Sequence, residues 1–270
     1  MQNVTSEAGA LFREGKLTAA IEAANASVRR WPADLGARVL LAELLLFAGQ
    51  IERADVILDA AAQADPSSSV VVAEFRQLLR AETARKQLRT DGRLPEFLGE
   101  PSPALRAQLA AHVALRAGDL AEAARLTQET ELLRPRASGR HDDAVFDDFR
   151  DADDLAAGYF EVLTTTGKYY WIPTERVATA AFHAPKRPRD LAWRRVTMVV
   201  YEGPEGDVYI PATYAADRRE VEEQFRLGRA TDWHEDQNLV RGVGQRVFLA
   251  GETSLPVMEV KHLQFGAGGT

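Results

Sequence analysis

The sequence contains no cysteine among its 270 residues. This absence excludes disulfide bonds, thiolate zinc sites, cysteine-ligated iron–sulfur clusters and a cysteine nucleophile. The sequence also lacks the run of about 20 apolar residues that a membrane-spanning helix needs. Its most apolar stretch, residues 39–49, is short and includes Glu43. The first residues have neither a basic start nor an apolar centre, so we expect no secretory signal and a cytoplasmic protein.

Basic residues are fewer than acidic residues. Lys and Arg number 33 against 40 Asp and Glu, which gives a net charge of −7. A protein that binds nucleic acid broadly needs a basic footprint, so we expect no nucleic-acid partner. Hydrophobic residues at 46% and charged residues at 27% are ordinary for a soluble globular protein.

The two halves of the chain differ in composition. The first half is rich in Ala, Leu, Arg and Glu, which favour helices, whereas Val, Thr, Tyr, Phe and Trp increase from about residue 155. We therefore predict a multi-domain α+β protein. An all-α domain is expected over residues 1–135, an acidic linker over 136–155, and a small, mostly antiparallel β-rich domain with one helix over 156–270.

The first half contains a repeat in which a glycine precedes a proline by 17 residues. The pairs are Gly15 and Pro32, Gly49 and Pro66, and Gly118 and Pro135. Each glycine permits a left-handed turn between two helices, and each proline ends the second helix. The first two copies lie 34 residues apart, which resembles the tetratricopeptide repeat, whereas the third copy is degenerate. Residues 70–89 are expected to form one long helix between the second and third copies.

Stacked helical hairpins form a concave groove that can hold a peptide or a short amphipathic helix. Alignment of the second and third copies places eight residues on this predicted groove: Val39, Glu43, Leu46, Phe47, Gln108, His112, Leu115 and Arg116. The alternative is that Val39, Leu46 and Phe47 pack inside the helical core.

In the second half, short runs of β-forming residues predict strands, and one helix is expected over residues 217–229. The predicted strands cover residues 168–172, 177–183, 196–201, 208–214, 247–250 and 257–265. The aromatic residues of this half either form a ligand-binding face, as in a small-molecule sensor, or pack in the core. They are Tyr169, Tyr170, Trp171, Trp193 and Trp233.

Residues 142–154, DDAVFDDFRDADD, contain seven Asp and one Arg. One interpretation is an acidic strip that docks a basic partner, formed by Asp147, Asp148, Asp151, Asp153 and Asp154. A second is a divalent-cation site, which makes a metal-dependent hydrolase the alternative function. The third is a solvated linker or the start of a helix.

No other motif indicates a catalytic, metal-binding or cofactor-binding site. The five histidines are scattered and lack zinc-site spacing, and neither a complete phosphate-binding loop nor a nucleophile elbow is present. We therefore assign no catalytic residue, no metal ligand and no cofactor, and we expect no small-molecule substrate.

Six segments of the second half follow one another in an order that resembles a known family. They are FDDFRDADD (146–154), GKYYWIP (167–173), PRDLAW (188–193), IPATY (210–214), LGRATDW (227–233) and GVGQR (242–246). With the helical repeats before them, they resemble the ImpE family, also called TagJ or SciE-type, over about residues 8–265.

This resemblance implies an accessory protein of the bacterial type VI secretion system with no established enzymatic role. It implies a tetratricopeptide-like domain followed by a smaller β-rich domain. The implied partners are the small sheath subunit TssB and, in some systems, the AAA+ ATPase ClpV. Our hypothesis is a non-enzymatic adaptor that holds a helical segment of TssB in its groove.

Overall fold

The computed structural model describes residues 4–64, 69–215 and 221–266. Seven helices occupy the described part of the first half, in agreement with its composition. They are α1 (Val4–Arg13), α2 (Leu17–Arg30), α3 (Leu35–Phe47), α4 (Ile51–Ala64), α5 (Ser69–Thr90), α6 (Pro103–Arg116) and α7 (Leu120–Leu133). The single long helix expected over residues 70–89 is confirmed as α5.

The predicted glycine turns are present in all three helical hairpins. Gly15, Gly49 and Gly118 have φ angles of 87°, 71° and 82°, in the left-handed region that glycine adopts without a steric penalty. They separate α1 from α2, α3 from α4, and α6 from α7. The repeat pattern therefore identified the hairpins correctly.

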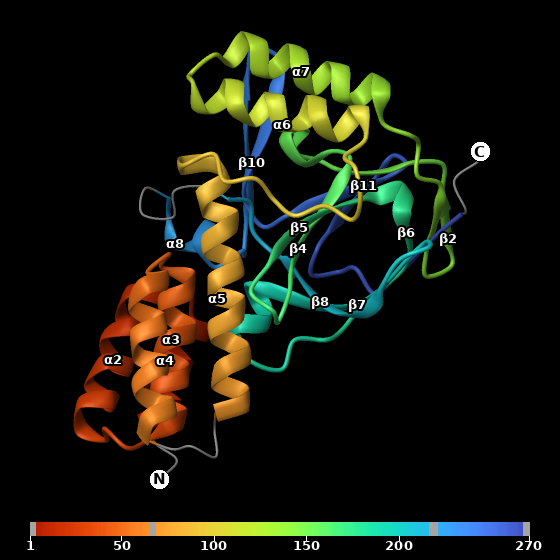
Figure 1. Ribbon diagram of the computed structural model, residues 1–270. Helices are drawn as coiled ribbons and strands as arrows, with labels where there is room; N and C mark the ends of the chain where they lie inside the picture. Colours follow the sequence, from red (N-terminus) through yellow and green to blue (C-terminus); the bar gives the residue numbers. More distant parts are fainter. Residues whose placement is uncertain (1–3, 65–68, 216–220, 267–270) are drawn as a thin grey trace.

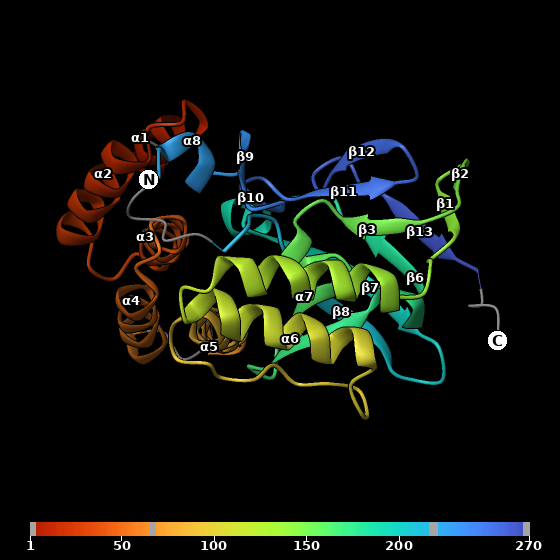
Figure 2. The same ribbon diagram turned by 90° about the horizontal axis from the view of Figure 1, so that it is seen from above.

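The third hairpin does not continue the stack of the first two. Figures 1 and 2 show α1–α4 as one bundle, α5 running between that bundle and the sheet, and α6 with α7 lying over a different part of the β-rich region. Ala111 on α6 and Ala123 on α7 pack in a cluster with Leu155 and Leu239 from the second half. The three hairpins therefore form no continuous concave surface.

The second half is an antiparallel β structure, as predicted. Its largest sheet has the strand order β2-β1-β13-β6-β7-β8-β4-β5, and the strands β12-β11-β3 and β10-β9 form two smaller sheets. The strands are β1 (Gly139–His141), β2 (Ala144–Phe146), β3 (Phe149–Asp151), β4 (Tyr159–Leu163), β5 (Tyr169–Pro173), β6 (Val177–Phe182), β7 (Trp193–Val200), β8 (Glu205–Pro211), β9 (Thr231–Asp236), β10 (Leu239–Gly244), β11 (Val247–Ala250), β12 (Thr253–Pro256) and β13 (His262–Phe265).

The structure corrects two predicted segments. Residues 136–155 are not a linker, because they contain β1, β2, β3 and most of the short 3-10 helix η2 (Asp154–Ala156). Phe146 and Phe149 anchor this segment in the core of the β-rich region. The helix expected over residues 217–229 is reduced, within the described residues, to α8 (Glu223–Arg226). Residues 216–220 of that expectation lie outside the described residues.

One hydrophobic core joins the two halves. Leu41, Leu45 and Phe75 from the helices pack in the same cluster as Trp171 and Trp193 from the strands. The Phe75 and Trp193 rings meet edge to face, with centroids 6.0 Å apart. Of the aromatic residues considered for a ligand face, Tyr169, Trp171 and Trp193 are therefore core residues.

Candidate functional site

The chain itself fills the groove predicted for the second helical hairpin. Glu43, Leu46 and Phe47 are at most 3% exposed, and Val39 packs partly buried against the same cluster. Helix α3 faces the short 3-10 helix η4 (Pro188–Leu191) of the β-rich region. A partner helix cannot reach Glu43, Leu46 or Phe47 in this structure, so the prediction that these three line an open groove is corrected, whereas Val39 keeps some accessible surface. The Phe47 ring packs on Phe12 of α1, with centroids 5.2 Å apart, as the alternative of packing inside the helical core predicts.

Glu43 is a buried carboxyl group at this contact. Burial raises its pKa to about 7, although the guanidinium of Arg189 lies near enough to oppose the shift. Its Oε1 atom has no hydrogen-bond partner among the described residues. An unpartnered buried oxygen favours the protonated form of the acid.

Two of the four residues predicted on the third hairpin are also buried. Gln108 donates from Nε2 to the carbonyl oxygen of Asp154 at 3.0 Å, and Nε2 of His112 lies 3.0 Å from the carbonyl oxygen of Leu155. Burial lowers the pKa of His112 to about 4, so this ring is neutral at physiological pH. Leu115 is half-buried and Arg116 is exposed.

The predicted acidic strip does not form one surface. Asp148 is bound by Arg134 through two hydrogen bonds, and Asp154 accepts a hydrogen bond from Arg150 at 2.6 Å. Asp147 is largely exposed, whereas Asp151 and Asp153 are at most 3% exposed. No group of three or more metal-ligating side chains converges anywhere in the described ranges. The hydrolase hypothesis therefore finds no support here.

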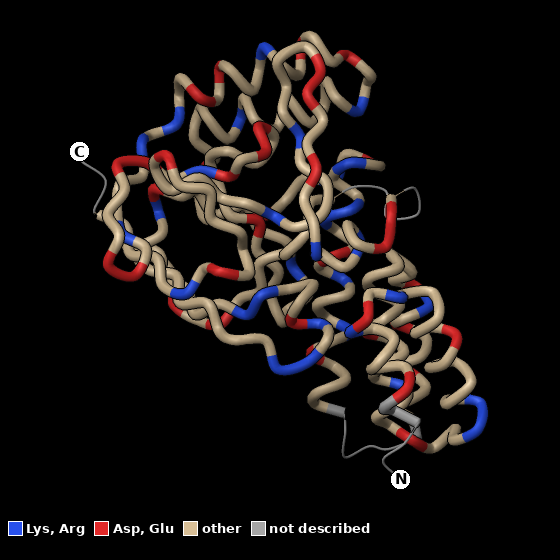
Figure 3. Tube along the Cα trace, turned by 180° about the vertical axis from the view of Figure 1, so that it is seen from behind, with Lys and Arg blue, Asp and Glu red and all other residues tan. Residues whose placement is uncertain are grey.

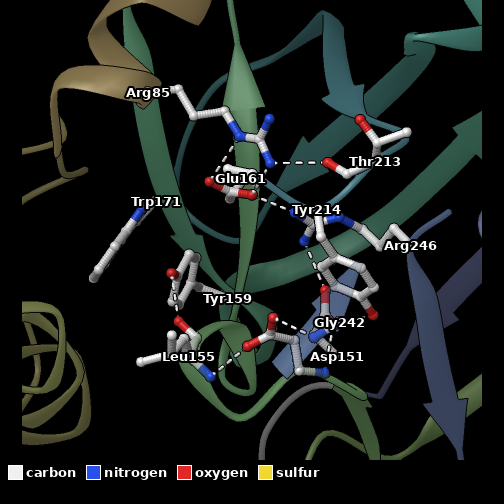
Figure 4. Close-up of polar contacts among 12 residues, drawn as sticks. Arg85, Asp151, Leu155, Tyr159, Glu161, Trp171, Thr213, Tyr214, Gly242 and Arg246 are labelled. Atoms are coloured by element: carbon white, nitrogen blue, oxygen red, sulfur yellow. Dashed lines mark hydrogen bonds and ion pairs between the residues drawn. The ribbon is translucent and has the colours of Figure 1, made fainter. Parts of the chain in front are cut away.

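Asp151 belongs instead to a buried network of five charged residues, of which Figure 4 labels Arg85, Asp151, Glu161 and Arg246. Arg85 of α5 donates two hydrogen bonds to Glu161 of β4, at 3.0 Å from Nε and 2.9 Å from Nη2. Arg246 donates to Oε2 of Glu161, the oxygen that also accepts from Nη2 of Arg85, and, at 2.6 Å, to Asp151 of β3. Glu82 of α5 also accepts from Nη1 of Arg85, at 3.2 Å, so three carboxylates and two guanidinium groups alternate across the junction of the two halves.

Neighbouring groups complete this network. The Tyr214 hydroxyl donates to Asp151 at 2.9 Å, and the carbonyl oxygen of Thr213 accepts from Arg85 at 3.0 Å. Burial alone would raise the pKa of Glu161, but Arg85 and Arg246 outweigh burial and hold that pKa well below its ordinary value. Burial raises the pKa of Asp151 to about 6, so both carboxylates are ionised at neutral pH.

The network acts as a structural clamp between the halves. All five charged side chains are nearly inaccessible to solvent, and each carboxylate is paired with a guanidinium group. Such closed pairing compensates the cost of burying charge and leaves no free nucleophile or base for a substrate.

Sequence reasoning did not single out Arg85, Glu161 or Arg246. A detectable signal was present at Glu161, because a charged residue interrupts the apolar run YFEVL of β4. Its two partners lie 76 and 85 positions away along the chain, so no local pattern could pair them.

Comparisons with known proteins agree with this architecture. Residues 11–79 match the tetratricopeptide repeat, and residues 143–264 match the family described as ImpE protein. The chain is 31% identical over 258 residues to the type VI secretion system accessory component TagJ of Pseudomonas aeruginosa, covering 94% of this chain and 89% of that protein.

The fold also matches a solved structure. A Vibrio parahaemolyticus protein known from a crystal structure superposes with a TM-score of 0.90 at 27% identity, covering 96% of this chain and 97% of that one. No helix within the described residues is long and apolar enough to span a membrane. From these likenesses over nearly its whole length, the chain belongs to the ImpE family, whose member TagJ is an accessory component of the type VI secretion system.

Proposed function

We propose that this protein is a non-enzymatic, cytoplasmic adaptor that binds a helical segment of the small sheath subunit TssB and, in some systems, contacts the ATPase ClpV. The observation that carries the proposal is the 31% identity to an accessory component across 94% of the chain. The tetratricopeptide-like hairpins support it, because such repeats commonly bind peptides or helices.

The partner contacts the outer surface of the protein and not the concave side of the first two hairpins. The short helix η4 of the β-rich region already packs against α3 on that side, and Leu46 and Phe47 have no exposed surface. Of the eight residues predicted for the groove, Val39, Leu115 and Arg116 retain accessible surface. These three stay candidates for partner contact.

The proposal is tested with the full-length chain and purified TssB from the same secretion system. We expect binding at micromolar concentration or tighter by surface plasmon resonance. A TssB lacking its helical segments serves as the control and should not bind. Absence of binding to intact TssB, with the adaptor folded by circular dichroism, overturns the proposal.

ClpV is tested in a separate experiment. ClpV is added to the preformed complex of adaptor and TssB, and to each protein alone. Retention of ClpV that depends on the adaptor supports the link to the ATPase. Equal retention with and without the adaptor removes ClpV from the proposal and leaves TssB binding unaffected.

A further inference from the structure

A second polar site lies apart from the buried network, beside the first turns of α5. It is a cleft of about 380 Å³ bounded by α5, β7, β8 and the connection between β6 and β7. Four cationic side chains line it: Lys186, Arg187, Arg189 and Arg195. Figure 3 shows blue on the loop that passes beneath the sheet next to α5, in a chain whose net charge is −7.

Two carboxylates of the cleft already accept hydrogen bonds from arginine side chains and hydroxyl groups of the chain. Glu74 accepts hydrogen bonds from Arg189 at 2.7 Å and from the Tyr209 hydroxyl at 3.0 Å. Asp207 accepts from Arg195 and, at 2.6 Å, from the Thr197 hydroxyl. Glu74 and Asp207 therefore pair with Arg189 and Arg195 and not with the other two cations of the cleft.

The third carboxylate, that of Asp190, fixes the loop that carries those two cations. Its Oδ2 atom accepts from the backbone N–H groups of Lys186 and Arg187, at 2.8 and 3.2 Å. Pro185 and Pro188 flank the pair and restrict the backbone further. The side chains of Lys186 and Arg187 are exposed, and no carboxylate of the described residues forms an ion pair with either. Two unpaired cations are thus held on an ordered backbone.

An apolar ledge adjoins these cations. Val70 and Val71, in the first turn of α5, are 78% and 50% exposed, and Val71 lines the cleft. Exposed aliphatic side chains next to unpaired cations fit a segment that presents acidic groups beside an apolar side chain.

We propose that this cleft docks an acidic segment of the protein partner, with carboxylates on Lys186 and Arg187 and an apolar side chain on Val71. The inference rests on the proposed adaptor function and names the surface that the adaptor uses. The excess negative charge of the chain repels an acidic segment elsewhere, so the cleft both attracts and orients it.

The test compares two charge reversals in the full-length chain. The variant K186E/R187E reverses the cleft, and R29E/R30E reverses an exposed pair at the end of α2 as the matched control. We expect K186E/R187E to bind TssB at least tenfold more weakly and with less dependence on salt, and the control to bind within twofold of the wild-type protein. Equal affinity of K186E/R187E and wild type overturns the cleft assignment while TssB binding itself stands.

A labelled hexaglutamate peptide distinguishes failure of the cleft from failure of the adaptor function. Fluorescence anisotropy should show binding to the wild-type chain at low salt and its loss in K186E/R187E. If TssB does not bind the wild-type chain, the adaptor function fails, and the peptide result alone decides whether the cleft takes acidic segments. Absence of peptide binding, or its displacement by an equal concentration of inorganic phosphate, overturns the docking proposal.

Discussion

Glu161 is a charged residue in the middle of a fully buried strand, at 3% exposure. A lone buried carboxylate is strongly unfavourable, but two guanidinium groups compensate this one. Arg85 reaches it from a helix of the first half and Arg246 from the β-rich region. The residue therefore couples the two halves through charge as well as through packing.

The variant Glu161→Gln tests this clamp. Loss of the negative charge leaves Arg85 without its principal counter-ion, so we expect the free energy of unfolding to fall by about 3 kcal/mol. Urea denaturation at neutral pH measures the change. Arg125→Ala, which breaks an exposed helical pair with Glu122, is the control and should leave the urea midpoint unchanged. Wild-type stability of Glu161→Gln contradicts the role of the network.

Glu43 gives a pH dependence of stability. Its pKa is about 7 when folded, against an ordinary value of 4.5, so between these values the folded chain keeps a proton that the unfolded chain has lost. Stability therefore falls as the pH rises from about 4.5 to 7, by about 3 kcal/mol for this group, and stays low above pH 7.

Replacement of Glu43 by Gln should remove the pH dependence of stability that this carboxyl group causes. We expect Glu43→Gln to gain stability relative to the wild-type protein at pH 8 and to lose most of that gain at pH 5, as measured by urea denaturation at both values. Glu52→Gln, at an exposed position of α4, provides the comparison. A Glu43→Gln effect of the same size at both pH values would show that the carboxyl group does not titrate in this window.

At the scale of elements, glycines serve the hairpins and the strands differently. Gly118 turns the chain between α6 and α7 with φ at 82°, and the space that an added Cβ would occupy is open. Gly242 of β10 lies against the Tyr214 ring, where an added Cβ would come within 2.1 Å of the ring. The first position needs a backbone conformation, and the second needs the absence of a side chain.

These two requirements predict different losses of stability when each glycine is replaced by alanine. Gly118→Ala should lose about 1 kcal/mol of stability, because only the left-handed backbone is penalised. Gly242→Ala should lose about 3 kcal/mol, because Tyr214 must move and its hydrogen bond to Asp151 weakens. Thermal unfolding measures both. Tryptophan fluorescence should shift in Gly242→Ala alone, since the Trp233 ring meets Tyr214 at 5.7 Å. Equal costs would contradict this distinction.

Local sequence patterns predicted the helical hairpins well and the acidic segment poorly. Gly15, Gly49 and Gly118 set the hairpin turns through their own backbone freedom, which is a local property. The many Asp residues of 142–154 led to the prediction of a linker. Phe146 and Phe149 are nevertheless buried, and their burial makes the segment part of a sheet. Besides its neighbour β2, β1 pairs with β13, about 120 positions later in the sequence, and β3 pairs with β11, about 100 positions later.

At the scale of the whole molecule, two hydrophobic clusters and the buried ion network span both halves. Trp171 and Trp193 lie in the larger of these clusters, so their fluorescence reports on the junction. We expect the protein to unfold in a single transition, with coincident urea midpoints from tryptophan fluorescence and from far-ultraviolet circular dichroism, which is dominated by the helices. Two separated midpoints would show that the helical half folds independently of the sheet.

The sequence by itself determined the helical hairpins, the β-rich second half and the family, because these depend on local propensity, on turn residues and on the order of segments. Only the tertiary structure decided which surfaces stay open. His112, for example, has the spacing of a groove residue, but Leu155 and Trp171 of the second half bury it. Burial depends on contacts between residues far apart in the sequence, and a local pattern cannot specify such contacts.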